Sequence, residues 1–122
     1  MKLFLVLGAI NGFLAVALGA FGAHGLEGKL SEKALKTWEK AVNYQMFHTM
    51  ALFVVGLLIA RIESVGMMWA GWLFFLGILL FSGSLYIYSV SGLKTFAMIT
   101  PLGGVAFLIG WILLGYVVIK FL

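Results

Sequence analysis

The longest uncharged run in this chain is residues 64–93, SVGMMWAGWLFFLGILLFSGSLYIYSVSGL, which holds thirty residues without Asp, Glu, Lys or Arg. Three further uncharged runs accompany it, at residues 3–26, 41–60 and 95–119. A transmembrane helix needs about 20 predominantly apolar residues, so each run is long enough to cross a bilayer. The sequence therefore predicts an all-α, polytopic membrane protein with four transmembrane helices in a single domain that covers residues 1–122.

The composition excludes several classes of protein. Of 122 residues, 64% are hydrophobic and 10% are charged, whereas a soluble domain has about 25% charged residues. A soluble enzyme, a disordered chain and a nucleic-acid-binding module are therefore excluded. The net charge of +4 comes from lysines and one arginine at predicted helix ends and in loops, where positive charge meets anionic headgroups. The chain has no cysteine, which excludes disulfides and thiol chemistry.

We expect spans at about 3–23, 41–60, 67–88 and 101–120. The third is trimmed by aromatic anchors, which favour the two membrane interfaces, and the fourth opens with Thr100 as N-cap and Pro101 as first helical residue. Residues 61–66 form a short turn, and residues 91–100 a longer loop. The apolar run of the first span exceeds the usual 7–15 residues of a signal-peptide core, so we expect it to be retained.

Residues 31–40 predict an amphipathic helix. Ser31 is a suitable N-cap, and one face of this segment carries apolar residues including Trp38, while the other carries charged residues. Such a helix is suited to the membrane surface, with a bend near Lys40 before the second span. A soluble connecting helix is the alternative.

Four spans place both termini on the same side of the membrane. The loops at 24–40 and 91–100 carry five lysines, against three basic residues in the termini and the 61–66 loop. The positive-inside rule therefore predicts long loops in the cytoplasm and termini outside, in a bacterial plasma membrane.

Small residues form stripes in the first and fourth spans. They recur every three or four positions: Gly8, Gly12, Ala15, Gly19 and Gly22, then Gly103, Ala106 and Gly110. Small residues let helix backbones approach closely in a bilayer. We interpret the stripes as helix packing within one bundle; the alternatives are a homo-oligomer contact and close approach of a ligand. Asn11 lies beside the first stripe, and its amide is expected to bond across helices.

A polar cluster marks the candidate site. Its members lie at membrane-embedded or adjacent positions: His24, Asn43, Tyr44, Gln45, His48, Thr49, Ser82 and Ser84. An ionisable group such as His48 within a span is a functional-site hypothesis by default, and His24 is expected at the same membrane face. Two imidazoles could ligate haem or help to bind a metal. The alternative is a neutral His48 that is hydrogen-bonded to Asn43, Tyr44 or a neighbouring helix.

Four motifs resemble a known family. They are GAFGAHGL (19–26), WEKAVNYQMFH (38–48), FSGSLY (81–86) and ITPLGG (99–104). In this order they resemble the small bacterial membrane proteins catalogued as domain of unknown function 423, the YgdD/YwdK-like proteins, which have a eukaryotic small transmembrane relative. The resemblance implies a compact four-span protein of the bacterial plasma membrane and no biochemical activity. Its motif residues correspond here to His24, Trp38, Tyr44, Gln45, His48, Ser82, Ser84, Thr100 and Pro101.

Three functions are compatible with these patterns. The first is a binding or assembly protein that packs with the bilayer, with itself or within a larger membrane complex. The second is a small oligomeric transporter or channel with His48 in its pathway. The third is a haem or metal protein using His24 and His48. No nucleophile–base set is present in the spans, because all four acids are glutamates in loops or flanking segments. We therefore expect neither an enzyme nor a bound cofactor or metal, and no nucleic-acid partner.

Overall fold

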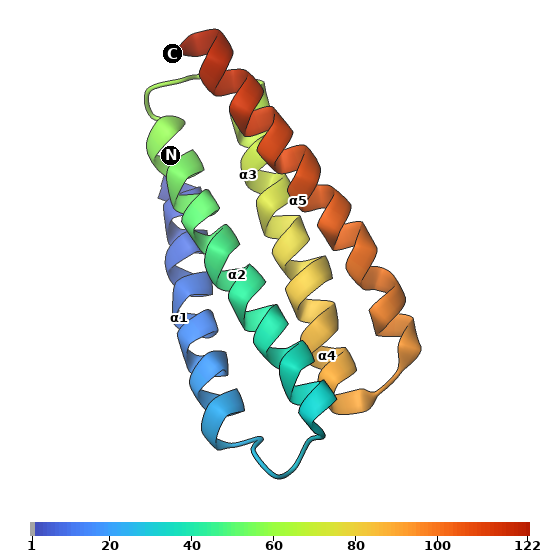
Figure 1. Cartoon of the computed structure of the whole chain (residues 1–122). Coiled ribbons are helices and arrows are strands. Elements are labelled where there is room, and N and C mark those ends of the chain that lie inside the picture. Colours follow the sequence, from blue (N-terminus) through green and yellow to red (C-terminus); the bar gives the residue numbers. More distant parts are fainter. Residues whose placement is uncertain (1) are drawn as a thin grey trace.

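Residues 2–122, which the computed structural model describes, form four long helices that run antiparallel to their neighbours in sequence (Figure 1). They are α1 (Lys2–His24), α2 (Glu32–Leu58), a continuous helix at Val65–Ser91, and α5 (Lys94–Phe121). The third comprises α3 (Val65–Gly77), a π-helical segment η1 (Ile78–Gly83) and α4 (Ser84–Ser91). All four are long and apolar enough to cross a membrane, which confirms the four predicted spans.

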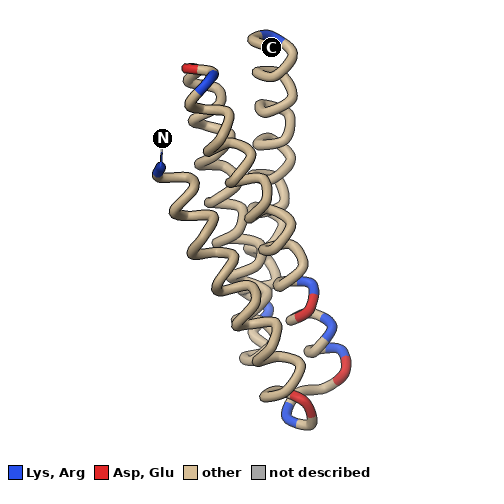
Figure 2. The backbone as a smooth tube through the Cα atoms, turned by 90° about the vertical axis from the view of Figure 1, so that its left-hand side faces the viewer, with Lys and Arg blue, Asp and Glu red and all other residues tan. Residues whose placement is uncertain are grey.

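Charged residues lie at the two ends of the bundle, and the length between them is uncharged (Figure 2). One end carries Arg61, Glu63 and the chain termini; the other carries the 25–31 connection and the first turns of α2 and α5. We call the second the loop end. This distribution is that of a multi-pass membrane protein, because charged groups avoid the hydrocarbon core.

The segment predicted to be an amphipathic helix at residues 31–40 is helical from Glu32 onward. It forms the first turns of α2 and not a separate helix. The Ser31 hydroxyl caps this helix by accepting a hydrogen bond from the Ala34 N–H at 3.1 Å. Trp38 is buried against α1, where its indole lies beside Gly22 and its Nε1 donates to the Leu18 carbonyl at 2.9 Å. The predicted bend near Lys40 is therefore wrong: packing of Trp38 on α1 holds this segment in line with the second span.

The fourth span begins seven residues earlier than predicted. α5 starts at Lys94 after a tight connection at Gly92, which has a φ of 70° that favours glycine. The predicted loop at 91–100 is thus wrong, and so is the assignment of Thr100 and Pro101 to the helix start. Pro101 lies inside α5, where it removes one backbone donor. The Thr100 hydroxyl donates to the Phe96 carbonyl at 3.3 Å instead of capping the helix.

The third helix also extends beyond its predicted bounds at 67–88. Its 27 residues correspond to about 40 Å at 1.5 Å per residue, so its ends reach past a hydrocarbon core of about 30 Å.

α5 packs closely on the third helix because the small residues of α5 face it. Cβ atoms added at Gly103 and Gly110 would meet the backbone of Phe81 and the ring of Phe74.

The small residues of α1 face α2. A Cβ at Gly8 would lie 3.1 Å from the Phe53 ring, and one at Gly12 would lie 3.6 Å from the Thr49 methyl. Gly19 faces Val42 in the same way, and Ala15 is fully buried. The stripe is therefore covered by a neighbouring helix of the same chain.

Candidate functional site

Gln45 connects three helices through its side-chain amide. Its Nε2 donates to the Asn11 Oδ1 of α1 at 3.0 Å, and its Oε1 accepts from the Tyr86 hydroxyl of α4 at 2.7 Å. Gln45 is 4% exposed, so both bonds are shielded from solvent. The neighbouring Thr49 hydroxyl donates to the Gln45 carbonyl at 2.7 Å. The side-chain polar groups of Gln45 and Thr49 are thus hydrogen-bonded within the bundle.

The two serines of the predicted site also join helices. The Ser82 hydroxyl donates to the Ala41 carbonyl at 2.7 Å, which ties η1 to α2. The Ser84 hydroxyl lies 2.6 Å from the Thr100 hydroxyl, which ties α4 to α5. Both serines are buried. Their roles in this structure are interhelical contacts of the kind that stabilise membrane bundles.

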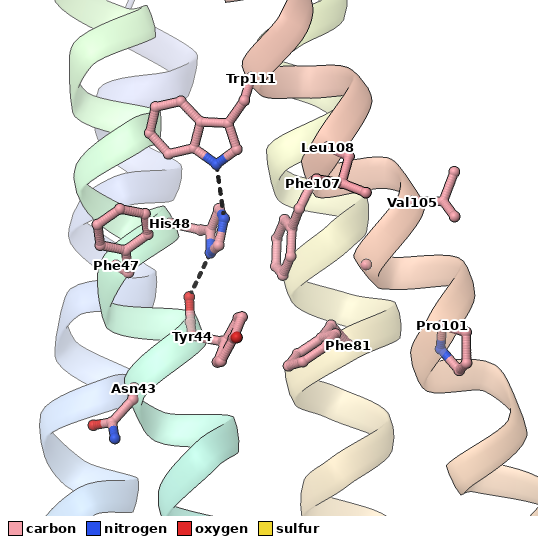
Figure 3. A pocket seen from close by; sticks show the side chains of 11 residues that line it. Asn43, Tyr44, Phe47, His48, Phe81, Pro101, Val105, Phe107, Leu108 and Trp111 are labelled. Carbon is pink, nitrogen blue, oxygen red and sulfur yellow. Dashed lines mark hydrogen bonds between the residues drawn. The ribbon is translucent and has the colours of Figure 1, made fainter.

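Both ring nitrogens of His48 are hydrogen-bonded, one to α5 and the other to the backbone of α2 itself (Figure 3). The Trp111 Nε1–H donates to His48 Nε2 at 3.1 Å. An indole N–H can only donate, so Nε2 is the acceptor and the ring proton sits on Nδ1. From there it is donated to the Tyr44 carbonyl at 2.8 Å. The imidazole also stacks on Phe107, with ring centroids 3.5 Å apart and planes within 6°. His48 is therefore a neutral imidazole with a fixed tautomer.

An apolar groove of about 740 Å³ opens beside this imidazole, between α2, η1 and α5. Aromatic rings gather along it, as Figure 3 shows. The lining residues are Asn43, Tyr44, Phe47, His48, Phe81, Pro101, Gly104, Val105, Phe107, Leu108 and Trp111. Its volume falls within the range of about 300–1,000 Å³ for small-molecule sites, which are mostly apolar with a few polar groups. Here the polar groups are the Asn43 amide, the Tyr44 hydroxyl and the His48 ring.

The close contact between α5 and η1 explains why the groove exists. Gly103 lets the α5 backbone meet that of η1 at Phe81, so α5 packs on α3 and η1. α2 and α5 approach each other through the rings of His48, Phe107 and Trp111 instead. Beside these rings Gly104 has no side chain, and a Cβ there would be in ordinary contact with the Phe81 ring at 3.9 Å. The space beside Gly104 remains open.

The structure divides the predicted polar cluster into two groups. Gln45, Thr49, Ser82 and Ser84 lie inside the bundle, whereas Asn43, Tyr44 and His48 line the groove. His24 joins neither group: it is exposed at the last residue of α1.

The two histidines do not approach each other. Gly12 faces Thr49, which is next to His48, so His24 lies twelve residues further along α1. At 1.5 Å per residue this is about 18 Å. His48 moreover faces α5, while α1 packs on another side of α2. His24 and His48 therefore do not converge, and one chain does not offer both imidazoles to a single metal or haem iron.

Sequence reasoning missed the α5 side of the site. Phe107 and Trp111 are four residues apart, which places two rings on one helix face. In an apolar span this spacing is equally typical of lipid-facing or packed aromatics. Only the register between α5 and α2 shows that both rings contact His48.

These features define a class of protein: a multi-pass membrane protein built as an antiparallel helix bundle, with an aromatic groove between two helices. The chain belongs to the family described as Protein of unknown function (DUF423), whose model matches residues 18–104. This confirms the resemblance drawn from the four motifs.

Named relatives match over nearly the whole length. The chain is 54% identical to the UPF0382 membrane protein YwdK of Bacillus subtilis (strain 168), with 100% of both chains covered. It is also 54% identical to a UPF0382 membrane protein of Staphylococcus aureus (strain bovine RF122 / ET3-1), with 99% of this chain and 98% of the relative covered. No solved structure matches.

Proposed function

We propose that this chain is a non-catalytic binding protein of the bacterial plasma membrane, which holds an amphipathic ligand drawn from the bilayer. The observation that carries the proposal is the groove between α2 and α5, whose size and aromatic lining suit an apolar chain. Its few polar groups lie on α2, at Asn43, Tyr44 and His48. Polar groups placed on one wall in this way are suited to orient a bound ligand, and we do not expect them to react with it.

The chemistry of the lining supports binding over catalysis. Acyl and phosphoryl transfer need a nucleophile with a base, or groups that stabilise developing charge. The lining has no carboxylate, serine or lysine. The imidazole in the lining, His48, already makes two hydrogen bonds inside the protein. His48 thus supports the groove by fixing Trp111 and stacking on Phe107.

The other functions receive less support from these observations. Assembly through the small-residue stripes would require surfaces that Val42 and Phe53 cover on α1. Proton-coupled transport through His48 would require the imidazole to release Trp111 or Tyr44. A site formed by His24 and His48 would require a second chain.

Substitution of one groove glycine tests the proposal. Gly104→Leu places a side chain in the groove, because its Cβ meets only the Phe81 ring at ordinary contact distance. Gly115→Leu is the matched control on the same helix, since a Cβ there has no neighbour within 4 Å. After extraction in mild detergent, native mass spectrometry counts lipid-like molecules retained per chain. We expect the wild type and Gly115→Leu to retain one and Gly104→Leu to lose it. Equal retention in all three would refute the proposal.

A further inference from the structure

Three lysines continue the two walls of the groove toward the loop end. On α2, Lys36, Lys40 and Tyr44 succeed one another at four-residue intervals and so share one helix face. On α5, Lys94 and Pro101 are seven residues apart and share a face in the same way. Tyr44 and Pro101 line the groove. The lysines therefore lie on the faces that form it.

The spacing along the helices places these charges just beyond the end of the groove at which Asn43 and Pro101 lie. Lys40 lies three residues from Asn43, which is about 5 Å at the helical rise. Lys36 lies seven residues from Asn43, and Lys94 seven residues from Pro101, about 10 Å in each case. All three lysines are exposed, so their ammonium groups are free to turn toward a ligand.

Two glutamates lie among these lysines on α2. Glu32 is four residues before Lys36, so the two side chains lie on one helix face. Glu39 is four residues before Asn43, and both border a crevice between α1 and α2. Figure 2 shows charged residues of both signs at the loop end, with uncharged residues along the length of the bundle beyond them. Three lysines and two glutamates leave this end of the groove with a net positive charge, and the groove itself is apolar.

A cationic end beside a long apolar groove matches a ligand with an anionic head and a hydrocarbon tail. Basic pockets between helices at a membrane surface bind anionic headgroups, and lysine ammonium groups bind phosphate as point charges. The Tyr44 ring lies 4.4 Å from the Phe81 ring by centroids, which places the Tyr44 side chain at the junction of head and tail. Its hydroxyl and the Asn43 amide are suited to ester or phosphate oxygens.

We propose that the groove holds one anionic phospholipid, with its phosphate among Lys36, Lys40 and Lys94 and one acyl chain extending past Phe107 toward Trp111. This inference rests on the proposed function and specifies its ligand. A zwitterionic lipid is disfavoured because its cationic headgroup would lie among three lysines. Free phosphate lacks the tail that the groove accommodates.

Titration of the delipidated full-length protein with phosphatidylglycerol, phosphatidylcholine or inorganic phosphate, followed by native mass spectrometry, tests the inference. The key variant is Lys36→Gln/Lys40→Gln/Lys94→Gln, which changes exposed residues only. Lys29→Gln is the control at the same end but outside the groove, and Gly104→Leu blocks the tail. Near a membrane surface each lysine contributes about fivefold in affinity for anionic lipid. We therefore expect about a hundredfold weaker phosphatidylglycerol binding in the triple variant and little change in Lys29→Gln.

The outcomes separate this inference from the proposed function. Preference for phosphatidylglycerol that is lost both in the triple variant and in Gly104→Leu supports both. Equal binding of the two lipids, lost only in Gly104→Leu, leaves the proposed function intact and overturns the inference. Displacement of the lipid by millimolar phosphate also overturns it, because the site would then recognise the phosphate alone. Binding that Gly104→Leu does not affect overturns both.

Discussion

Replacement of Gln45 by leucine tests whether the buried polar ties hold the bundle together. Leucine has a similar size but makes neither the bond to Asn11 Oδ1 nor the one from the Tyr86 hydroxyl. An interhelical hydrogen bond in a membrane protein contributes about 0.6–2 kcal/mol, and two are lost. We expect the free energy of unfolding to fall by about 1–4 kcal/mol, because both bonds connect separate helices and leucine replaces neither of them.

Reversible unfolding in mixed micelles with increasing dodecyl sulfate, followed by tryptophan fluorescence, measures this change. Asn43→Leu is the matched control: it also replaces an amide by leucine on α2, but at an exposed position. Its effect should stay within about 0.5 kcal/mol. A double-mutant cycle with Tyr86→Phe should give a coupling energy of about 0.5–2 kcal/mol. If Gln45→Leu is no more destabilising than Asn43→Leu, the polar ties do not stabilise the bundle and the reasoning is refuted.

Three further predictions follow from individual contacts. Gly22→Ala should cost about 1–3 kcal/mol in the same unfolding assay, because its Cβ would meet the Trp38 indole, whereas Gly12→Ala should be close to neutral since its Cβ would lie 3.6 Å from Thr49; equal effects would contradict this packing. Trp111→Phe should let the His48 ring proton redistribute from Nδ1 toward Nε2, detected by ¹⁵N NMR of the imidazole, whereas Trp69→Phe on the exposed surface should not; an unchanged His48 spectrum would exclude the Trp111 bond. Pro101→Ala should raise the free energy of unfolding by up to about 3 kcal/mol, since it restores a backbone donor inside α5; a lower value would show that Pro101 stabilises α5.

Hydropathy was sufficient to predict the helix class and the number of spans, because the hydrocarbon core imposes length and polarity on each helix. Hydropathy could not predict the residues at which each helix begins and ends. Thr100 and Pro101 are residue types that often begin a helix. In the structure, however, the Thr100 hydroxyl is hydrogen-bonded to the Phe96 carbonyl and the Ser84 hydroxyl. The Ser31 N-cap of α2 was predictable, but the tertiary contact of Trp38 with Gly22 of α1 is not encoded by local propensity.

The candidate site was predictable on one helix only. The polar residues of α2 stand out because amides and imidazoles are rare inside spans, and Asn43, Tyr44 and His48 do line the groove. Their partners Phe107 and Trp111 are aromatic residues in an aromatic-rich span, so no local signal separates them from lipid-facing rings. The π-helical segment that carries Phe81 is equally invisible to periodicity. Helix register between α2 and α5 is a property of the folded bundle.

NMR of the protein in micelles with one added ¹³C-labelled phosphatidylglycerol per chain directly tests whether the groove between α2 and α5 holds a lipid. A lipid held in the groove should give a resolved set of acyl-chain resonances with cross-peaks to the rings of Phe81 and Trp111, which disappear in Gly104→Leu and persist in Gly115→Leu. Acyl resonances that stay averaged with the micelle, and that are the same in both variants, would contradict it.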